Sequence, residues 1–177
     1  DNKMNAILRR KSIYKEFFLN KKLQITFLYI LIFAIPFFFK SPQYVIGTIV
    51  NFLLIMSFSK FNIKRVFPIL FLPSIATFLS GKIFGGATNF LLYLIPFISL
   101  SNFMFVYLFK KIKFKYLNVL ISSIVKASFL FASAFVLHKT IGLPALFLTT
   151  MGISQFYTAI SGGTLAYLTL LVDKKKI

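Results

Sequence analysis

The fold is decided by residues 89–137, in which two apolar runs flank a short basic segment. The first run, 89–109, reads NFLLYLIPFISLSNFMFVYLF; the basic segment, 110–116, reads KKIKFKY; and the second run, 117–137, reads LNVLISSIVKASFLFASAFVL. About 20 apolar residues in a helix suffice to cross the hydrocarbon core of a bilayer. Clustered lysines beside such runs are typical of the cytoplasmic side. The stretch therefore predicts two membrane-crossing helices joined by a cytoplasmic turn.

Further apolar runs extend this pattern in both directions. They cover residues 23–39, 42–58, 66–80 and 144–172, and hydrophobic residues make up 58% of the 177-residue chain. So much apolar side chain leaves too little polar surface for a water-soluble globule. The shorter runs depend on flanking lysines whose ammonium groups reach the lipid headgroups. We expect an all-α, polytopic membrane protein with six transmembrane helices.

The basic residues alternate between the two sides of these predicted spans. Of the 21 Lys and Arg residues, 17 fall in the N-terminal segment, in alternate loops and in the tail, whereas the other loops carry Lys40, Lys82 and Lys139 alone. The positive-inside rule then places both the N-terminus and the C-terminus in the cytoplasm. We divide the chain into a basic N-terminal segment (1–22), a transmembrane domain (23–172) and a basic cytoplasmic tail (173–177). The first segment has the composition of an interfacial amphipathic helix or of a solvated tail.

The composition excludes several classes of function. The chain has three acidic residues, one histidine (His138) and no cysteine. Paired-carboxylate catalysis, thiolate nucleophiles and metal sites are therefore excluded, and we expect no enzymatic activity. An intramembrane enzyme using Lys126 and His138 is a weaker alternative, since no carboxylate would orient either group. The basic residues that give the chain its net charge of +18 lie between the apolar runs. Their placement predicts a lipid bilayer as partner rather than nucleic acid.

Polar side chains within the apolar runs are the candidate binding residues. Such a group costs free energy in hydrocarbon unless it finds a partner or a water-filled pocket. At the rise of an α-helix, five of them lie at similar depth, roughly 13 to 20 Å from the outer surface: Asn51, Asn102, Lys126, Gln155 and Tyr157. Facing inward, they would form a polar floor without negative charge, suited to a neutral or anionic small molecule. Interhelical hydrogen bonds, and extension of Lys126 towards the cytoplasmic headgroups, are the alternative interpretation.

Small residues suggest two further features. Ala159, Gly162, Gly163 and Ala166 recur along one stripe of the last run and would let another helix approach closely. That helix could belong to this chain or to a separate subunit. Residues 80–89, which read SGKIFGGATN, form the most glycine-rich outer segment. The segment could be a compact turn or could bring backbone close to a ligand.

Together these features resemble the substrate-capture (S) components of energy-coupling factor (ECF) transporters. The resemblance covers residues 23–172 and rests on size, inward termini and diffuse motifs. These are PQYVIGTIVN at 42–51, PSI at 73–75 before the glycine-rich loop, YLIPF at 93–97, SN at 101–102, QFYTA at 155–159 and GG at 162–163.

The resemblance implies a multi-pass protein of the bacterial cytoplasmic membrane that captures a scarce micronutrient, such as a vitamin, from outside. A transmembrane coupling subunit and two cytoplasmic ATPases would then drive uptake. ATP would be used by these partners, and this chain would carry no cofactor. The loop between the first two spans would gate the site, and the loop after the third span and the last three spans would line it. On this chain that points to Tyr44, Lys82, Asn89, Tyr93, Lys126 and Gln155.

One departure from the family is evident in the first span. The Ala-x-x-x-Ala stripe that contacts the coupling subunit is missing, and Ala34 stands alone among Ile, Leu and Phe. A non-transport scaffold or assembly protein, holding a complex through its basic cytoplasmic loops, is the alternative function. Such a scaffold would share the topology but would need no ligand pocket.

Overall fold

The computed structural model describes residues 20–40, 42–114 and 116–175, whose regular secondary structure is entirely helical. This confirms the predicted all-α class. Residues 1–19 of the predicted interfacial segment, Lys115, and the last two residues of the predicted tail lie outside the described residues. The elements are α2 (Lys21–Phe38), α3 (Gln43–Lys60), α4 (Ile63–Val66), η1 (Phe67–Leu70), α5 (Leu72–Ser80), η2 (Gly85–Phe90), α6 (Leu91–Lys111), α7 (Leu117–Ile141), α8 (Leu146–Met151) and α9 (Ile153–Lys175).

Five helical stretches in the described part of the chain are long and apolar enough to cross a membrane, which indicates a multi-pass membrane protein. They are Lys21–Phe38, Gln43–Lys60, Ile63–Ser80, Gly85–Lys111 and Leu117–Ile141. Helix α9 has a comparable length but is not among them. Polar residues such as Gln155, Thr158 and Ser161 interrupt its apolar character. The sixth span therefore stays a prediction.

Two predicted spans are broken rather than continuous helices. In the run 66–80, Pro68 and Pro73 stand in the first turns of η1 and α5, where the missing backbone N–H of proline is tolerated. In the run 144–172 the chain turns between α8 and α9 at Gly152. A Cβ atom added there would lie 2.9 Å from the carbonyl oxygen of Leu148. In the described part of the chain, the breaks leave five long helices, which are α2, α3, α6, α7 and α9.

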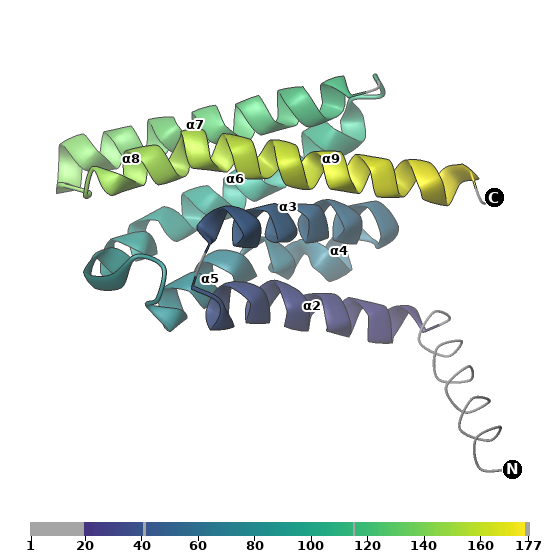
Figure 1. Cartoon of the computed structure of the whole chain (residues 1–177), viewed down its shortest axis with the longest axis horizontal. Helices are drawn as coiled ribbons and strands as arrows, with labels where there is room; N and C mark the ends of the chain where they lie inside the picture. Colours follow the sequence, from purple (N-terminus) through teal and green to yellow (C-terminus); the bar gives the residue numbers. More distant parts are fainter. Residues whose placement is uncertain (1–19, 41, 115, 176–177) are drawn as a thin grey trace, which may run out of the picture.

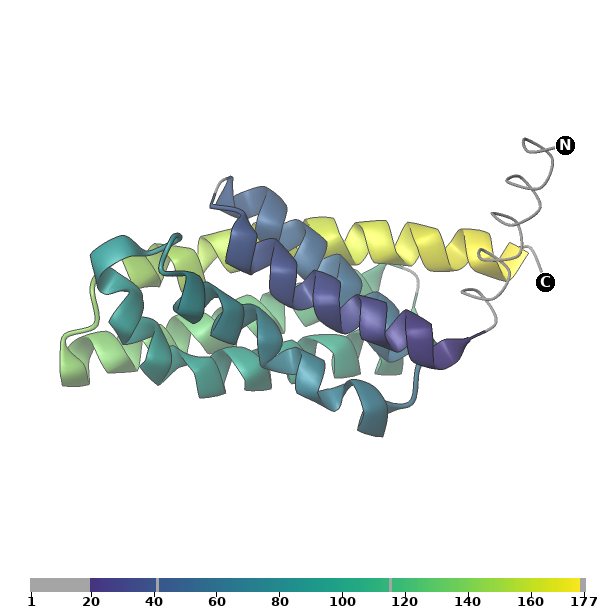
Figure 2. The same ribbon diagram turned by 90° about the horizontal axis from the view of Figure 1, so that it is seen from below.

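The turns between the long helices gather at two ends of the molecule (Figure 1). The start of α2, the α3–α4 turn, the α6–α7 turn and the end of α9 share one end, here called the basic end. The α2–α3, α5–α6 and α7–α8 connections lie at the other, here called the glycine-rich end, and the view in Figure 2 keeps this separation. The alternation of charge along the sequence is thus a separation in space. The described basic residues at the basic end are Lys21, Lys22, Lys60, Lys64, Arg65, Lys110, Lys111, Lys113, Lys174 and Lys175, and those at the other end are Lys40, Lys82 and Lys139. Lys126 lies between the two ends, on α7.

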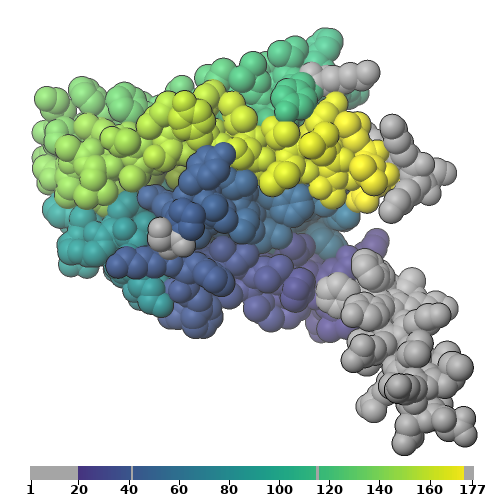
Figure 3. Space-filling model, in the orientation of Figure 1, coloured from purple at the N-terminus to yellow at the C-terminus, as the bar shows by residue number. Residues whose placement is uncertain are grey.

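Helix α9 packs tightly against α3, and Figure 3 shows the two helices side by side on one face. A Cβ atom at Gly162 would lie 2.5 Å from the Thr48 carbonyl oxygen and 2.7 Å from the Asn51 Cβ atom. Ala159 and Ala166, on the same stripe, are fully buried. The stripe of small residues on α9 therefore packs within the chain, which is the first of its two interpretations. Ala34 is half-buried on α2.

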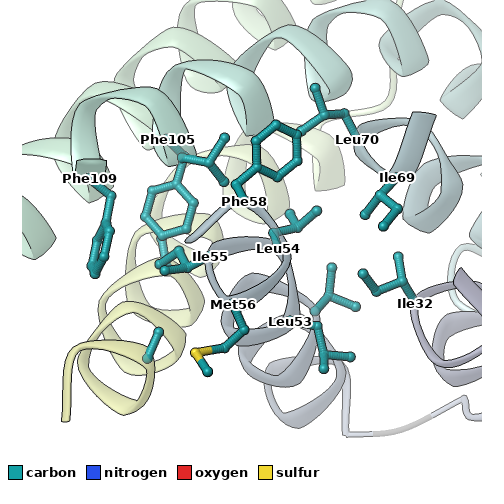
Figure 4. Packing of buried hydrophobic residues seen from close by; sticks show 14 of the residues in the cluster. Ile32, Leu53, Leu54, Ile55, Met56, Phe58, Ile69, Leu70, Phe105 and Phe109 are labelled. Atoms are coloured by element: carbon teal, nitrogen blue, oxygen red, sulfur yellow. The ribbon is translucent and has the colours of Figure 1, made fainter. Parts of the chain in front are cut away.

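Large apolar side chains fill the space between α3, α6, α7 and α9 on the side of the basic end. Figure 4 shows several of them, from α3 and α6, in one packed cluster. Gly163 of α9 belongs to the same level, because a Cβ atom there would lie 2.9 Å from a Val119 methyl group. We call this level the apolar layer and define it as Ile55, Phe58, Phe105, Phe109 and Val119, each at most 5% exposed.

We predict that Gly162→Ala destabilises the protein by about 1–3 kcal/mol, the usual cost of overpacking a core. The added methyl group would meet the backbone of α3, which cannot rotate away as a side chain could. Unfolding of the purified protein in detergent micelles measures the effect. Gly86→Ala is the matched control, since nothing lies within 4 Å of a Cβ atom there. Equal stability of the two variants would contradict the close α3–α9 contact.

Candidate functional site

A cavity of about 260 Å³ lies between the helices towards the glycine-rich end. This volume is close to the lower limit of small-molecule pockets, about 300 Å³. Its walls come from the end of α2, the start of α3, α5, the segment after α5, α6, the end of α8 and the start of α9. Its most buried polar residues come from α3, α6 and α7. The lining residues are Pro36, Gln43, Tyr44, Ile46, Gly47, Val50, Asn51, Pro73, Ser74, Thr77, Ile83, Phe84, Leu91, Ile98, Asn102, Lys126, Met151, Ser154, Gln155, Tyr157 and Thr158.

The floor of the cavity is built around the side chain of Lys126. Its Nζ atom donates to Asn51 Oδ1 at 2.5 Å and to Asn102 Oδ1 at 2.8 Å. The three side chains are 1–2% exposed. The ammonium also lies 5.0 Å from the centre of the Phe105 ring, at the top of the apolar layer. Three helices, α3, α6 and α7, therefore meet at one buried cation.

Each asparagine is held by a second hydrogen bond. Asn51 Nδ2 donates to Thr158 Oγ1 at 3.3 Å, and Asn102 Nδ2 donates to the Leu70 carbonyl oxygen at 3.0 Å. Because the NH₂ groups are engaged elsewhere, the amide oxygens are the atoms that face Lys126. The network thereby also includes α9, through Thr158, and the end of η1. A lysine ammonium has three N–H donors, and two of them are used here.

Helical spacing explains why these polar groups point inward. Lys126 follows the buried stripe of α7, with Val119, Ser122 and Ser123 before it and Leu130 and Ala134 after it, all at most 1% exposed. Residues three or four positions apart share one face of a helix. Asn102 likewise continues the buried stripe of α6 that runs through Leu94 and Ile98. The inward direction of each polar group thus follows from its position on the buried stripe of its helix.

No carboxylate neutralises Lys126 in the part of the chain that the structure describes. Asp173 is the acidic residue there, and it lies at the basic end with its Oδ2 atom 2.8 Å from Lys60 Nζ. Within the same described ranges, no three His, Asp or Glu side chains gather to hold a metal ion. The cavity therefore offers a cation, amide groups and hydroxyls.

The structure brings together six of the nine binding residues suggested by the sequence. The residues that line the cavity are Tyr44, Asn51, Asn102, Lys126, Gln155 and Tyr157. Tyr44 also forms a hydrogen bond through its hydroxyl group to Ser161 Oγ, which links α3 to α9 near the glycine-rich end.

The other three residues, Lys82, Asn89 and Tyr93, are exposed and do not line the cavity. Tyr93 is 56% exposed because it lies on the opposite face of α6 from Leu91 and Leu94. Lys82 Nζ instead lies 6.0 Å from the centre of the Phe37 ring. Sequence reasoning missed Gln43, Ser74 and Thr158, although Thr158 is three residues from Gln155 and so shares its face of α9.

We predict strong coupling between Asn102 and Lys126. Asn102→Leu leaves the buried ammonium with one amide acceptor and should cost about 1.5–3 kcal/mol, the range for a hydrogen bond to a charged group. Combined with Lys126→Met, the same change should cost much less, because the unpaired charge is gone. A double-mutant cycle of unfolding free energies in detergent micelles measures the coupling. Additive single effects would show that the two groups do not support one another.

The chain matches no protein-family model, and searches of curated proteins and of solved structures find no significant similarity.

Proposed function

We propose that this chain is the substrate-capture subunit of an ECF-type transporter, binding a small neutral or anionic micronutrient in the cavity and catalysing no reaction itself. The observation that carries the proposal is the buried ammonium of Lys126 at the cavity floor, with one N–H donor left and no carboxylate in the described residues to neutralise it. A buried cation without a counter-ion is expensive to maintain. A binding role explains why it stands at the bottom of a pocket rather than at the membrane surface.

The proposal includes six membrane crossings, with α9 as the sixth and both termini in the cytoplasm. Three lines of support are the charge separation between the two ends, the length of α9, and its packing between α3 and α7. In this orientation the positive-inside rule places the basic end in the cytoplasm. The cavity then faces the outside of a bacterial cytoplasmic membrane, where a scarce nutrient would be captured.

The apolar layer supports the need for partner subunits. Ile55, Phe105 and Val119 lie just below the floor and are at most 1% exposed. A polar ligand that reaches Lys126 therefore meets close-packed apolar side chains on its way to the basic end. Release into the cytoplasm needs a rearrangement driven from elsewhere, which in this family a transmembrane coupling subunit and two ATPases provide. A scaffold protein would share the basic end but would gain nothing from the cavity.

We predict the membrane topology to follow the two ends of the molecule. The chain has no cysteine, so single cysteines can be introduced without a background. Gly86→Cys and Ala145→Cys, at the glycine-rich end, should react with a membrane-impermeant maleimide in intact cells. Lys113→Cys and Val172→Cys should react only after permeabilisation. Labelling of Val172→Cys from outside would contradict α9 as the sixth span.

We predict that filling the cavity abolishes ligand capture. Val50 is 8% exposed and lines the cavity, so Val50→Phe places a phenyl ring in the ligand's volume. The small molecule that copurifies with the wild-type protein, measured by mass spectrometry, should be lost from this variant. Val45→Phe is the matched control, since Val45 lies on the same helix, is 45% exposed and does not line the cavity. Retention of the ligand by a folded Val50→Phe variant would contradict this site, and a protein that never carries or binds a small molecule would favour the scaffold.

A further inference from the structure

We propose that the ligand is a compact organic acid with one negative charge, and that its carboxylate accepts the remaining N–H of Lys126. This inference rests on the proposed function, because it assumes that the cavity captures a small molecule. It goes further in assigning the charge of the ligand and the group that meets the floor. The reasons are the hydrogen bonds of the cavity floor and the chemistry of the residues that surround it.

The floor holds Lys126 in place by neutral groups alone. Two amide oxygens and the Phe105 ring stabilise a cation through their dipoles and ring electrons without cancelling its charge. Neither asparagine can easily turn its oxygen away, since Thr158 and Leu70 hold the two NH₂ groups. The donor that remains is therefore fixed in position before the ligand arrives. A preorganised donor of this kind favours an anionic acceptor, which forms a shorter and stronger hydrogen bond than a neutral one.

The number of charges follows from the other residues of the cavity. Lys126 is the one charged side chain among the described lining residues. A single carboxylate would make the loaded site neutral. A dianion would carry surplus negative charge into a low-dielectric site, and a cation would face Lys126 as a like charge. Monocarboxylates are thus the ligand class with the smallest electrostatic cost.

The residues that line the upper part of the cavity indicate the chemistry of the rest of this acid, here called its body. Val50, Ile98 and Met151 are apolar and at most 8% exposed, and Phe84 and Leu91 also line the cavity. They suit an apolar or aromatic body attached to the carboxylate. A volume of about 260 Å³ suits a compact acid better than a long acyl chain. The carboxylate could nevertheless come from a water-soluble acid or from a fatty acid of the membrane, and the two sources must be separated by experiment.

The test uses the full-length protein, stripped of small molecules, in nanodiscs of uncharged phosphatidylcholine. Four probes are compared by calorimetric titration: benzoate, benzamide, phthalate and laurate. We expect a carboxylate probe to bind at least 10-fold more tightly than benzamide, and phthalate to bind more weakly than benzoate. In Lys126→Met the preference for benzoate over benzamide should fall by about 10- to 100-fold. Lys139→Met, an exposed lysine at the same end that does not line the cavity, should keep the preference.

The outcomes distinguish this inference from the function on which it rests. Tighter binding of benzoate than of laurate assigns the site to a compact, water-soluble acid, and the reverse overturns the compact body and assigns the carboxylate to a fatty acid. Equal binding of benzoate and benzamide, or a copurified molecule that is neutral, cationic or doubly negative, overturns the monocarboxylate assignment and leaves substrate capture intact. Should Lys126→Met fail to fold, the wild-type selectivity and the charge of the copurified molecule still decide. The absence of any bound molecule and of any probe binding overturns both.

Discussion

Burial of the Lys126 ammonium is the constraint on which the rest of the structure depends. Removing an ammonium from water costs several kcal/mol even after the protein relaxes, and here no carboxylate in the described residues offsets the cost. Two amide oxygens take that role, so Asn51 and Asn102 must lie within hydrogen-bond reach of one atom. This requires α3, α6 and α7 to stand at fixed separations and rotations. The pocket above the floor is therefore shaped by the same geometry that makes the buried charge tolerable.

The required separations are set by small residues. In a bilayer, lipid tails are as apolar as leucine, so helices associate mainly through close van der Waals contact and hydrogen bonds. Gly162 brings α9 against the backbone of α3, beside Asn51, and this in turn places Thr158 within reach of the Asn51 amide. The cavity survives towards the glycine-rich end because the packing there is made by short, broken elements. Helices α5 and α8 contribute side chains to its lining.

The sequence predicts the floor better than the walls, and the reason is physical. The rise of a helix is fixed, so counting residues from the ends of apolar runs suffices to place Asn51, Asn102 and Lys126 at one depth. Hydropathy does not register where a run is broken, so the predicted spans 66–80 and 144–172 do not locate the breaks between η1 and α5 and between α8 and α9. Residues such as Ser74, which the break before α5 brings to the cavity wall, are therefore not predicted as binding residues. Tyr93 shows a different limit, since a resemblance in sequence pattern does not fix which face of α6 turns inward.

The lack of acidic residues throughout the predicted transmembrane domain has a consequence for how such a site can work. A carboxylate beside Lys126 would lower the cost of the empty site, but it would also compete with an anionic ligand for the same ammonium. Amides stabilise the cation without competing with an anionic ligand for it. The free-energy cost of the buried charge therefore remains in the empty site, and an anionic ligand would gain the full benefit of neutralising it. The tight capture that we propose would oppose release, and the apolar layer below the floor would oppose it further. Such a pocket suits a subunit that binds its ligand strongly by itself and needs energy from a partner subunit to release it.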